Sequence, residues 1–152
     1  MKLRSREIPT IQRKYYARHP YNLKDLKEII LYGQYDKLYR SKKTEMIYQK
    51  DLKKGKMLRN HFSGRLQLRR NSYPYNFIGI QHWILIYHPK RDEEHRGWKI
   101  FGEKYKKTIS ELNPEISWIN PPNQRSQGHI PHAHLIFKNS RKIPQEYQQS
   151  WI

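Results

Sequence analysis

The chain has 152 residues, about the size of one domain, and carries 31 Lys and Arg against 13 Asp and Glu, a formal net charge of +18. So large an excess of positive charge indicates a polyanionic partner. We expect this partner to be nucleic acid rather than a membrane surface. The sequence has no Cys, which excludes disulfide frameworks, cysteine-ligated zinc sites and thiol nucleophiles. It has no secretory signal pattern and no apolar run of membrane-spanning length, so we expect a cytoplasmic protein.

The first 21 residues are basic and irregular. Six Lys or Arg in this segment face a single acid, Glu7, and two prolines interrupt any helix. Tyrosines are interleaved with the cations, as in segments that follow a phosphate backbone and stack on bases. We therefore predict a basic extended N-terminal arm over residues 1–21, followed by a single α+β domain over residues 22–152.

Two helices are predicted after the arm. In "NLKDLKEIILYG", Asn22 is a candidate N-cap with an acid three residues later, and Gly33 stands where a helix-ending glycine is expected. A second helix is expected from about Asp36 to Lys54, ended by Gly55.

The charge excess continues through the middle of the chain. From residue 37 to residue 70, 12 Lys or Arg face two acids. In "GRLQLRRN", basic and apolar residues alternate with period two, as in a strand or an extended arm. Such an element could lie between an apolar core and a phosphate backbone.

The second half of the chain predicts a small sheet. The strongest strand pattern is "YNFIGIQHWILIYHP", residues 75–89, which ends at a proline. "RDEEHRGWKIFGEKYKKTISEL" predicts a loop and then a helix with Trp98, Phe101, Tyr105 and Ile109 on one face. "EISWINPP" and "HAHLIFK" predict two further core strands, and "IPQEYQQSWI" predicts a short final helix. We expect an α+β fold: a small, mainly antiparallel sheet of about three core strands, two to four helices and the basic arm.

Three histidines, His129, His132 and His134, fall within six positions of "GHIPHAHLIF". They could be satisfied polar residues at the start of a buried strand, or part of a functional loop that contacts phosphates, sugars or bases. They could also ligate zinc, although no acid or Cys lies near them in the sequence. The other residues of the possible functional loop are Asn120, Asn123, Gln124 and Arg125.

Two enzyme families have similar histidine patterns, and the sequence departs from each. His132-Ala133-His134 resembles the His-hydrophobe-His strand of replication-initiator nucleases, but their Tyr-x-x-Lys nucleophile motif is matched only by Tyr147, with Ser150 in place of Lys. The same run resembles histidine-triad nucleotide hydrolases, but Ile136 stands where the third His should be. That change removes much of the network that activates the nucleophile. A nucleotide or phosphodiester hydrolase built on His132 and His134 is therefore the alternative function.

Longer segments carry a second kind of resemblance. "HWILIYHP" and "ISWINPPNQRSQGHIPHAHLIF", with the helix between them, resemble a family of small eukaryotic proteins from fungi and some large viruses, over about residues 76–138. A strand, Asn-Pro-Pro, Ser and a His-x-His strand recur in that family. The Lys-, Asn-, Ile- and Tyr-rich composition, the small size and the charge also resemble microsporidian ribosome-dormancy factors. That resemblance implies a non-enzymatic inhibitor that occupies a tRNA or mRNA site on idle ribosomes.

We therefore expect a ribosome-associated RNA-binding protein that acts as a dormancy (hibernation) factor. It would occupy a tRNA or mRNA site on idle ribosomes and inhibit translation sterically. A constitutive ribosomal protein would need the same surface chemistry. The expected partners are ribosomal RNA and neighbouring ribosomal proteins; we expect a monomer with no cofactor, no metal and no catalytic residue. Contacts with RNA are expected from the cations Arg4, Arg6, Arg13, Lys14, Arg18, Lys42, Lys43, Lys53, Lys54, Lys56, Arg59, Arg65, Arg69, Arg70 and Arg125, and stacking from Tyr15, Tyr16 and Phe62.

Overall fold

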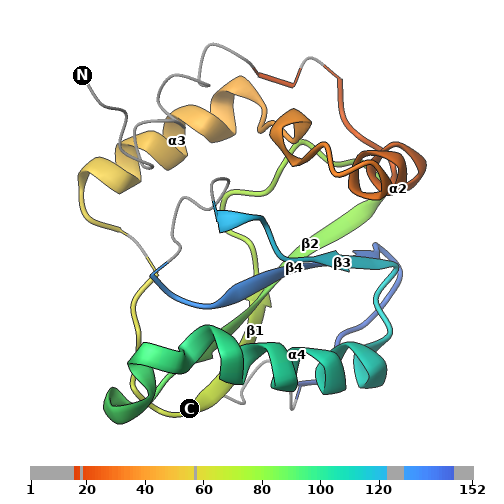
Figure 1. Cartoon of the computed structure of the whole chain (residues 1–152). Helices are drawn as coiled ribbons and strands as arrows, with labels where there is room; N and C mark the ends of the chain where they lie inside the picture. Colours follow the sequence, from red (N-terminus) through yellow and green to blue (C-terminus); the bar gives the residue numbers. More distant parts are fainter. Residues whose placement is uncertain (1–15, 18, 57, 123–128, 146–152) are drawn as a thin grey trace. The chain divides into compact units, whose positions relative to one another are not determined.

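The computed structural model describes residues 16–17, 19–56, 58–122 and 129–145. It has an α+β fold with a four-stranded antiparallel sheet in the order β1-β2-β4-β3 (Figure 1). The predicted fold class is confirmed, and the sheet has one strand more than the three or so expected. No helix among the described residues is long and apolar enough to cross a bilayer.

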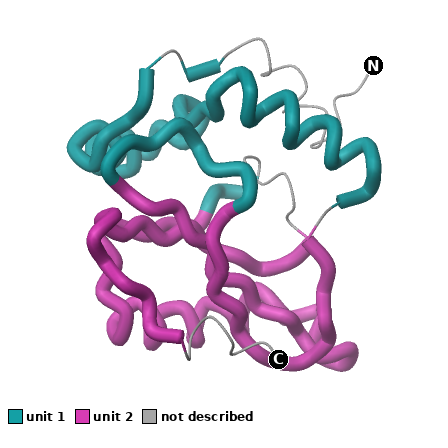
Figure 2. Tube along the Cα trace, turned by 180° about the vertical axis from the view of Figure 1, so that it is seen from behind, with its two compact units in different colours: residues 1–57, 72–79, 120–127 teal, residues 58–71, 80–119, 128–152 magenta. Residues whose placement is uncertain are grey.

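The chain forms two compact units (Figure 2). Unit 1 comprises residues 1–57, 72–79 and 120–127. Unit 2 comprises residues 58–71, 80–119 and 128–152 and contains the whole sheet.

The centre of unit 2 is β2 (Ile80–His88), which is buried along its entire length. It pairs with β1 (Arg65–Arg70) on one side and with β4 (His132–Lys138) on the other, and β4 also pairs with β3 (Ile116–Trp118). Because successive side chains of a strand point to opposite faces, β2 contributes Trp83, Leu85 and Tyr87 to one face and five residues to the opposite face. Those five are Ile80, His82, Ile84, Ile86 and His88.

One face of this sheet is covered by α4 (Gly97–Leu112), as Figure 1 shows. Phe101 and Leu112 of the helix are buried in a cluster with Leu85, Leu135 and Phe137 of the two central strands. The helical spacing predicted from the sequence is confirmed, since Trp98, Tyr105 and Ile109 pack against the same cluster. The six residues that directly precede α4 form a 3-10 helix, η3 (Arg91–Arg96). The sequence predicted a loop at this place.

The two α-helices of unit 1 differ in how well the sequence predicted where they begin. α2 (Leu23–Leu31) begins as predicted, because the Asn22 side chain and Asp25 form a reciprocal capping box, and it is followed by Gly33 at φ +66°. The predicted second helix starts too early. The structure has a short 3-10 helix, η2 (Tyr35–Lys37), and then α3 (Lys42–Lys53).

Two predicted starts are therefore corrected. The Ser41 side chain accepts a hydrogen bond from the Thr44 backbone at 3.3 Å and fixes the N-terminus of α3 there. The strand expected from residue 75 begins only at Ile80, because Gly79 turns the chain at φ +77° and Phe77 forms an isolated bridge with Tyr21. Residues 16, 17 and 19–21 of the predicted arm are described; the rest of it, and nearly all of the predicted final helix, lies outside the described residues.

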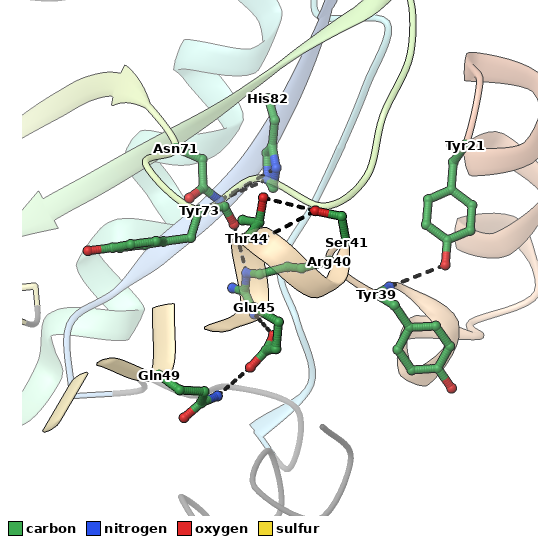
Figure 3. Close-up of polar contacts among 10 residues, drawn as sticks. All are labelled: Tyr21, Tyr39, Arg40, Ser41, Thr44, Glu45, Gln49, Asn71, Tyr73 and His82. Carbon is green, nitrogen blue, oxygen red and sulfur yellow. Dashed lines mark hydrogen bonds and ion pairs between the residues drawn. The ribbon is translucent and has the colours of Figure 1, made fainter. Parts of the chain in front are cut away.

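The interior of unit 1 is organised around a guanidinium group. The Arg40 Cζ atom lies 4.0 Å from the ring centre of Tyr48 and 5.4 Å from that of Tyr75. Its Nε donates to the Tyr73 carbonyl at 2.8 Å, and its Nη1 donates to Glu45 at 3.1 Å (Figure 3). Arg40 therefore joins α3 to the segment 72–79 through stacking, a hydrogen bond and an ion pair at once.

We expect Arg40→Lys to lower the free energy of unfolding by about 2 kcal/mol, because Lys keeps the charge but has no planar fork to stack on Tyr48 and donate to two acceptors together. Urea unfolding measures the change. The matched control is Arg59→Lys at an exposed position, with an expected change below about 0.5 kcal/mol. Equal stability of the two variants would show that charge alone holds unit 1.

Candidate nucleic-acid interface

The outer face of α3, continued by its C-cap Lys54, is basic and carries no acid. At 3.6 residues per turn, five lysines and two apolar residues fall within an arc of about 140°. All seven are exposed; Met46 and Ile47 are 58% and 46% exposed. The seven are Lys42, Lys43, Met46, Ile47, Lys50, Lys53 and Lys54. The sequence predicted four of these lysines as RNA contacts and missed Lys50.

Both acids of α3 lie on its other side. Glu45 is buried, paired with Arg40, and accepts a hydrogen bond from the Gln49 amide. Asp51 accepts from the Tyr73 hydroxyl at 2.6 Å and lies 4.0 Å from the Lys56 ammonium. The helix thus turns its carboxylates toward protein groups and its lysines toward solvent.

The predicted arginines of unit 2 separate into two faces of β1. Arg65 and Arg69 lie on one face and Arg70 on the other, and all three are exposed. The Arg70 guanidinium donates to the Gln81 side chain at 2.9 Å and lies 5.5 Å from the ring centre of Trp83. Arg70 is therefore engaged by β2 within the protein itself.

Several predicted contacts lie outside the described residues. These are Arg4, Arg6, Arg13, Lys14, Tyr15, Arg18, Asn123, Gln124 and Arg125. Tyr16 is described and partly exposed, and Asn120 is buried beside Tyr75, to which its side chain is hydrogen-bonded.

The sheet face opposite α4 carries four histidines. His132 and His134 of β4 alternate with core residues, and the strand pairing places them beside Ile86 and Ile84 of β2. That register brings His82 of β2 to the same face, where its Nε2 lies 2.8 Å from His134 Nδ1. Trp118 of β3 stacks on His134 at 4.9 Å between ring centres. All three of these histidines are buried.

Hydrogen bonds constrain which nitrogen of each imidazole carries a proton. His132 Nδ1 lies 2.7 Å from the Ile130 carbonyl, which can only accept, so Nδ1 donates and Nε2 holds the lone pair in the neutral ring. The Asn71 side-chain nitrogen lies 3.5 Å from His82 Nδ1 and 3.3 Å from His82 Nε2, so this contact does not distinguish the two ring nitrogens (Figure 3). In the 2.8 Å hydrogen bond between His82 Nε2 and His134 Nδ1, one nitrogen donates and the other accepts.

The imidazoles of His132 and His134, two positions apart on one strand, could act as bases or as two ligands of a divalent ion. Their ring centres lie 5.9 Å apart. Among the described residues, no group of three or more His, Cys, Asp or Glu side chains could hold a metal ion. The third histidine of the sequence cluster, His129, is exposed, and its Nε2 lies 2.9 Å from the Leu58 carbonyl.

His88, at the end of β2, forms a second pair that sequence reasoning missed. The His61 backbone N–H donates to His88 Nδ1 at 3.1 Å, so the neutral ring donates from Nε2 to Gln67 Oε1 at 2.9 Å. The two imidazoles stack with ring centres 4.2 Å apart. Burial, followed by the neighbouring His61 and Arg69, lowers the pKa of His88 to about 4. The even spacing of His82 and His88 along one strand was the available signal that they share a face.

This pKa predicts a pH-dependent stability. Between the unfolded pKa of His near 6.5 and the folded value of about 4, the unfolded chain binds more protons, so stability is present above this window and is lost as pH falls through it. We expect the free energy of unfolding to fall by about 2–3 kcal/mol less between pH 7 and pH 4 in His88→Gln than in the intact protein. Urea unfolding at pH 7 and pH 4 measures this, with exposed His95→Gln as the control. An unchanged slope in His88→Gln would assign the pH dependence to other groups.

No protein-family model matches the chain, and no curated protein sequence matches it. Among solved structures, the crystal structure of HTC1 is similar to this chain, with a TM-score of 0.52 and 21% identity, over 85% of this chain and 89% of that chain. At this identity the similarity shows the fold alone.

Proposed function

We propose that the protein binds structured RNA through basic surfaces that include the outer face of α3, and that its target is the ribosome. The observation that carries this proposal is the segregation of charge on α3, with five exposed lysines on one face and both carboxylates on the other. Ammonium groups arranged in this way neutralise phosphates and release counterions.

The apolar pair in the middle of this face supports a target that contains both RNA and protein. Met46 and Ile47 are exposed between the lysines, and an apolar pair gains little from contact with phosphates alone. A ribosomal surface presents phosphates beside protein side chains. The protein would occupy a tRNA or mRNA site on idle ribosomes in the cytoplasm and inhibit translation sterically, in keeping with the resemblance to dormancy factors.

We expect Lys42, Lys43 and Lys53 replaced together by Gln to weaken ribosome binding and to reduce the salt dependence of log K. Each phosphate contact that is lost should lower the slope by about 0.7 to 0.9. Co-sedimentation with ribosomes and subunits over a series of salt concentrations measures both quantities. Intact protein should co-migrate with a subunit or with idle monosomes at low salt and be absent from polysomes.

The matched control replaces Lys99, Lys106 and Lys107 of α4 by Gln, because these exposed lysines change the net charge by the same amount on a helix that also exposes Glu103 and Glu111. An equal loss in both variants would attribute binding to net charge rather than to α3. Absence of co-migration at low salt would contradict the proposed ribosomal target.

The second candidate function is phosphodiester or nucleotide hydrolysis at His132 and His134. The observation that favours it is that both imidazoles lie on one face of β4 and are hydrogen-bonded through Nδ1, His132 to the Ile130 carbonyl and His134 to His82. A hydrogen bond at one ring nitrogen orients a histidine that acts as a base or metal ligand through the other. Both rings are less than a tenth exposed, so substrate has little access to them in this conformation, and RNA binding stands first for that reason.

The double variant His132→Gln/His134→Gln tests this second function. If the histidines are catalytic, turnover of nucleotides or oligonucleotides with Mg²⁺, Mn²⁺ or Zn²⁺ should fall at least about 100-fold, as for the loss of a general base. Thermal unfolding of the variant shows whether the sheet is intact. No turnover by the intact protein with any of these ions would remove the hydrolase from consideration.

A further inference from the structure

The loop 58–64, before β1, is held against the end of β2 by its own side chains and backbone. The Asn60 side chain donates to the Pro89 carbonyl at 3.0 Å and accepts from the Phe62 backbone N–H at 2.8 Å. The Gly64 backbone N–H donates to the His88 carbonyl at 2.7 Å. With the His61–His88 contact, three hydrogen bonds join the loop to His88 and Pro89, and a fourth lies within the loop. Its side chains are therefore presented from a rigid support.

Phe62 adopts a backbone conformation that its side chain disfavours. Its φ is +55°, in the left-handed region where a bulky residue is an outlier. The other positive-φ residues of the described chain are glycines and Asn113, the C-cap of α4, and Asn tolerates this region. Strained residues of this kind persist where the surroundings determine them, and they concentrate at binding sites. The backbone conformation here favours glycine, so the presence of Phe indicates that its side chain has a role.

The ring of Phe62 lies in a cationic setting. The Arg91 Cζ atom is 3.9 Å from its centre, and the side chains of Arg59, His61 and Arg65 on the same loop and strand start are exposed. Three acids follow in η3, of which Glu93 accepts from the Tyr87 hydroxyl at 2.8 Å and from the Lys90 backbone N–H at 3.0 Å. A partly exposed aromatic ring beside guanidinium groups is the arrangement on which an unpaired base stacks while its phosphates meet the cations.

We propose that Phe62, with Arg59, Arg65 and Arg91, forms a stacking site for an unpaired nucleotide of the bound RNA. This inference rests on the proposed RNA-binding function and extends it from phosphate attraction to contact with one base. Because the loop is already rigid, stacking requires little further ordering, and the affinity gained is correspondingly larger.

Phe62→Gly is the decisive variant, because Gly adopts φ +55° without strain and the loop loses only the ring. The probe is an RNA hairpin with 2-aminopurine at an unpaired loop position, and a second hairpin carries it in the stem. We expect the protein to quench the loop fluorophore alone, and Phe62→Gly to lose this quenching together with about 5- to 100-fold in affinity for the hairpin. Phe62→Trp should retain both.

A matched control removes an aromatic ring elsewhere: Tyr32→Gly, at the exposed C-cap of α2. Phe62→Asn, which also tolerates positive φ, replaces Phe62→Gly if the latter has a lowered unfolding midpoint. Equal quenching by intact protein and Phe62→Gly, or an equal effect on stem and loop fluorophores, would overturn the stacking site. The variant of the α3 lysines tests RNA binding separately, so a failed stacking site and a failed RNA-binding function give different results.

Discussion

The charge imbalance of the chain is the constraint on which the rest of its structure depends, because 13 acids must offset 31 cations. Several carboxylates of the described residues serve the fold: Asp25 caps α2, buried Glu45 pairs with Arg40, and Asp51 accepts a hydrogen bond from Tyr73. Carboxylates used in this way cannot neutralise the outer surface. The lysines of α3 therefore repel one another, and this repulsion opposes the compact state. A polyanion that binds the folded chain removes the repulsion and stabilises the fold by linkage.

The two faces of the sheet in unit 2 differ in the polarity of their buried side chains. The face under α4 is an ordinary apolar core of aromatic and aliphatic side chains. The opposite face contains His132 and His134 at the start of β4, and His82 and His88 on either side of Ile84 and Ile86 in β2. Buried imidazoles cost free energy unless they are hydrogen-bonded, and His82, His88, His132 and His134 each have a hydrogen-bonding partner. These hydrogen bonds explain how the fold tolerates four imidazoles on one face of the sheet.

Sequence reasoning predicted those features whose causes are local. The capping box of Asn22, the left-handed Gly33 and the alternation of β1 all depend on neighbouring residues, and the structure has them as expected. The start of α3 was placed too early because Asp36 and Ser41 are residue types of similar capping strength, and the structure uses Ser41 as the N-cap. The contact of His82 with His134 could not be predicted, because it depends on the register between two strands 52 residues apart. Nor could the role of Arg40 be predicted, because it depends on Tyr73 and Tyr75 of the distant segment 72–79.

The RNA contacts that we propose for the α3 face and for the Phe62 loop would be of two different kinds. Lysines on a helix are long and flexible, and they bind any phosphate backbone with an affinity that falls as salt rises. The Phe62 loop is fixed by hydrogen bonds from Asn60, His61 and Gly64, and a stacked base needs an unpaired strand at a defined position. A protein with the lysines alone would follow any duplex. The addition of one rigid aromatic site would restrict it to RNA that exposes a base beside its helical segments, and folded ribosomal RNA meets this requirement.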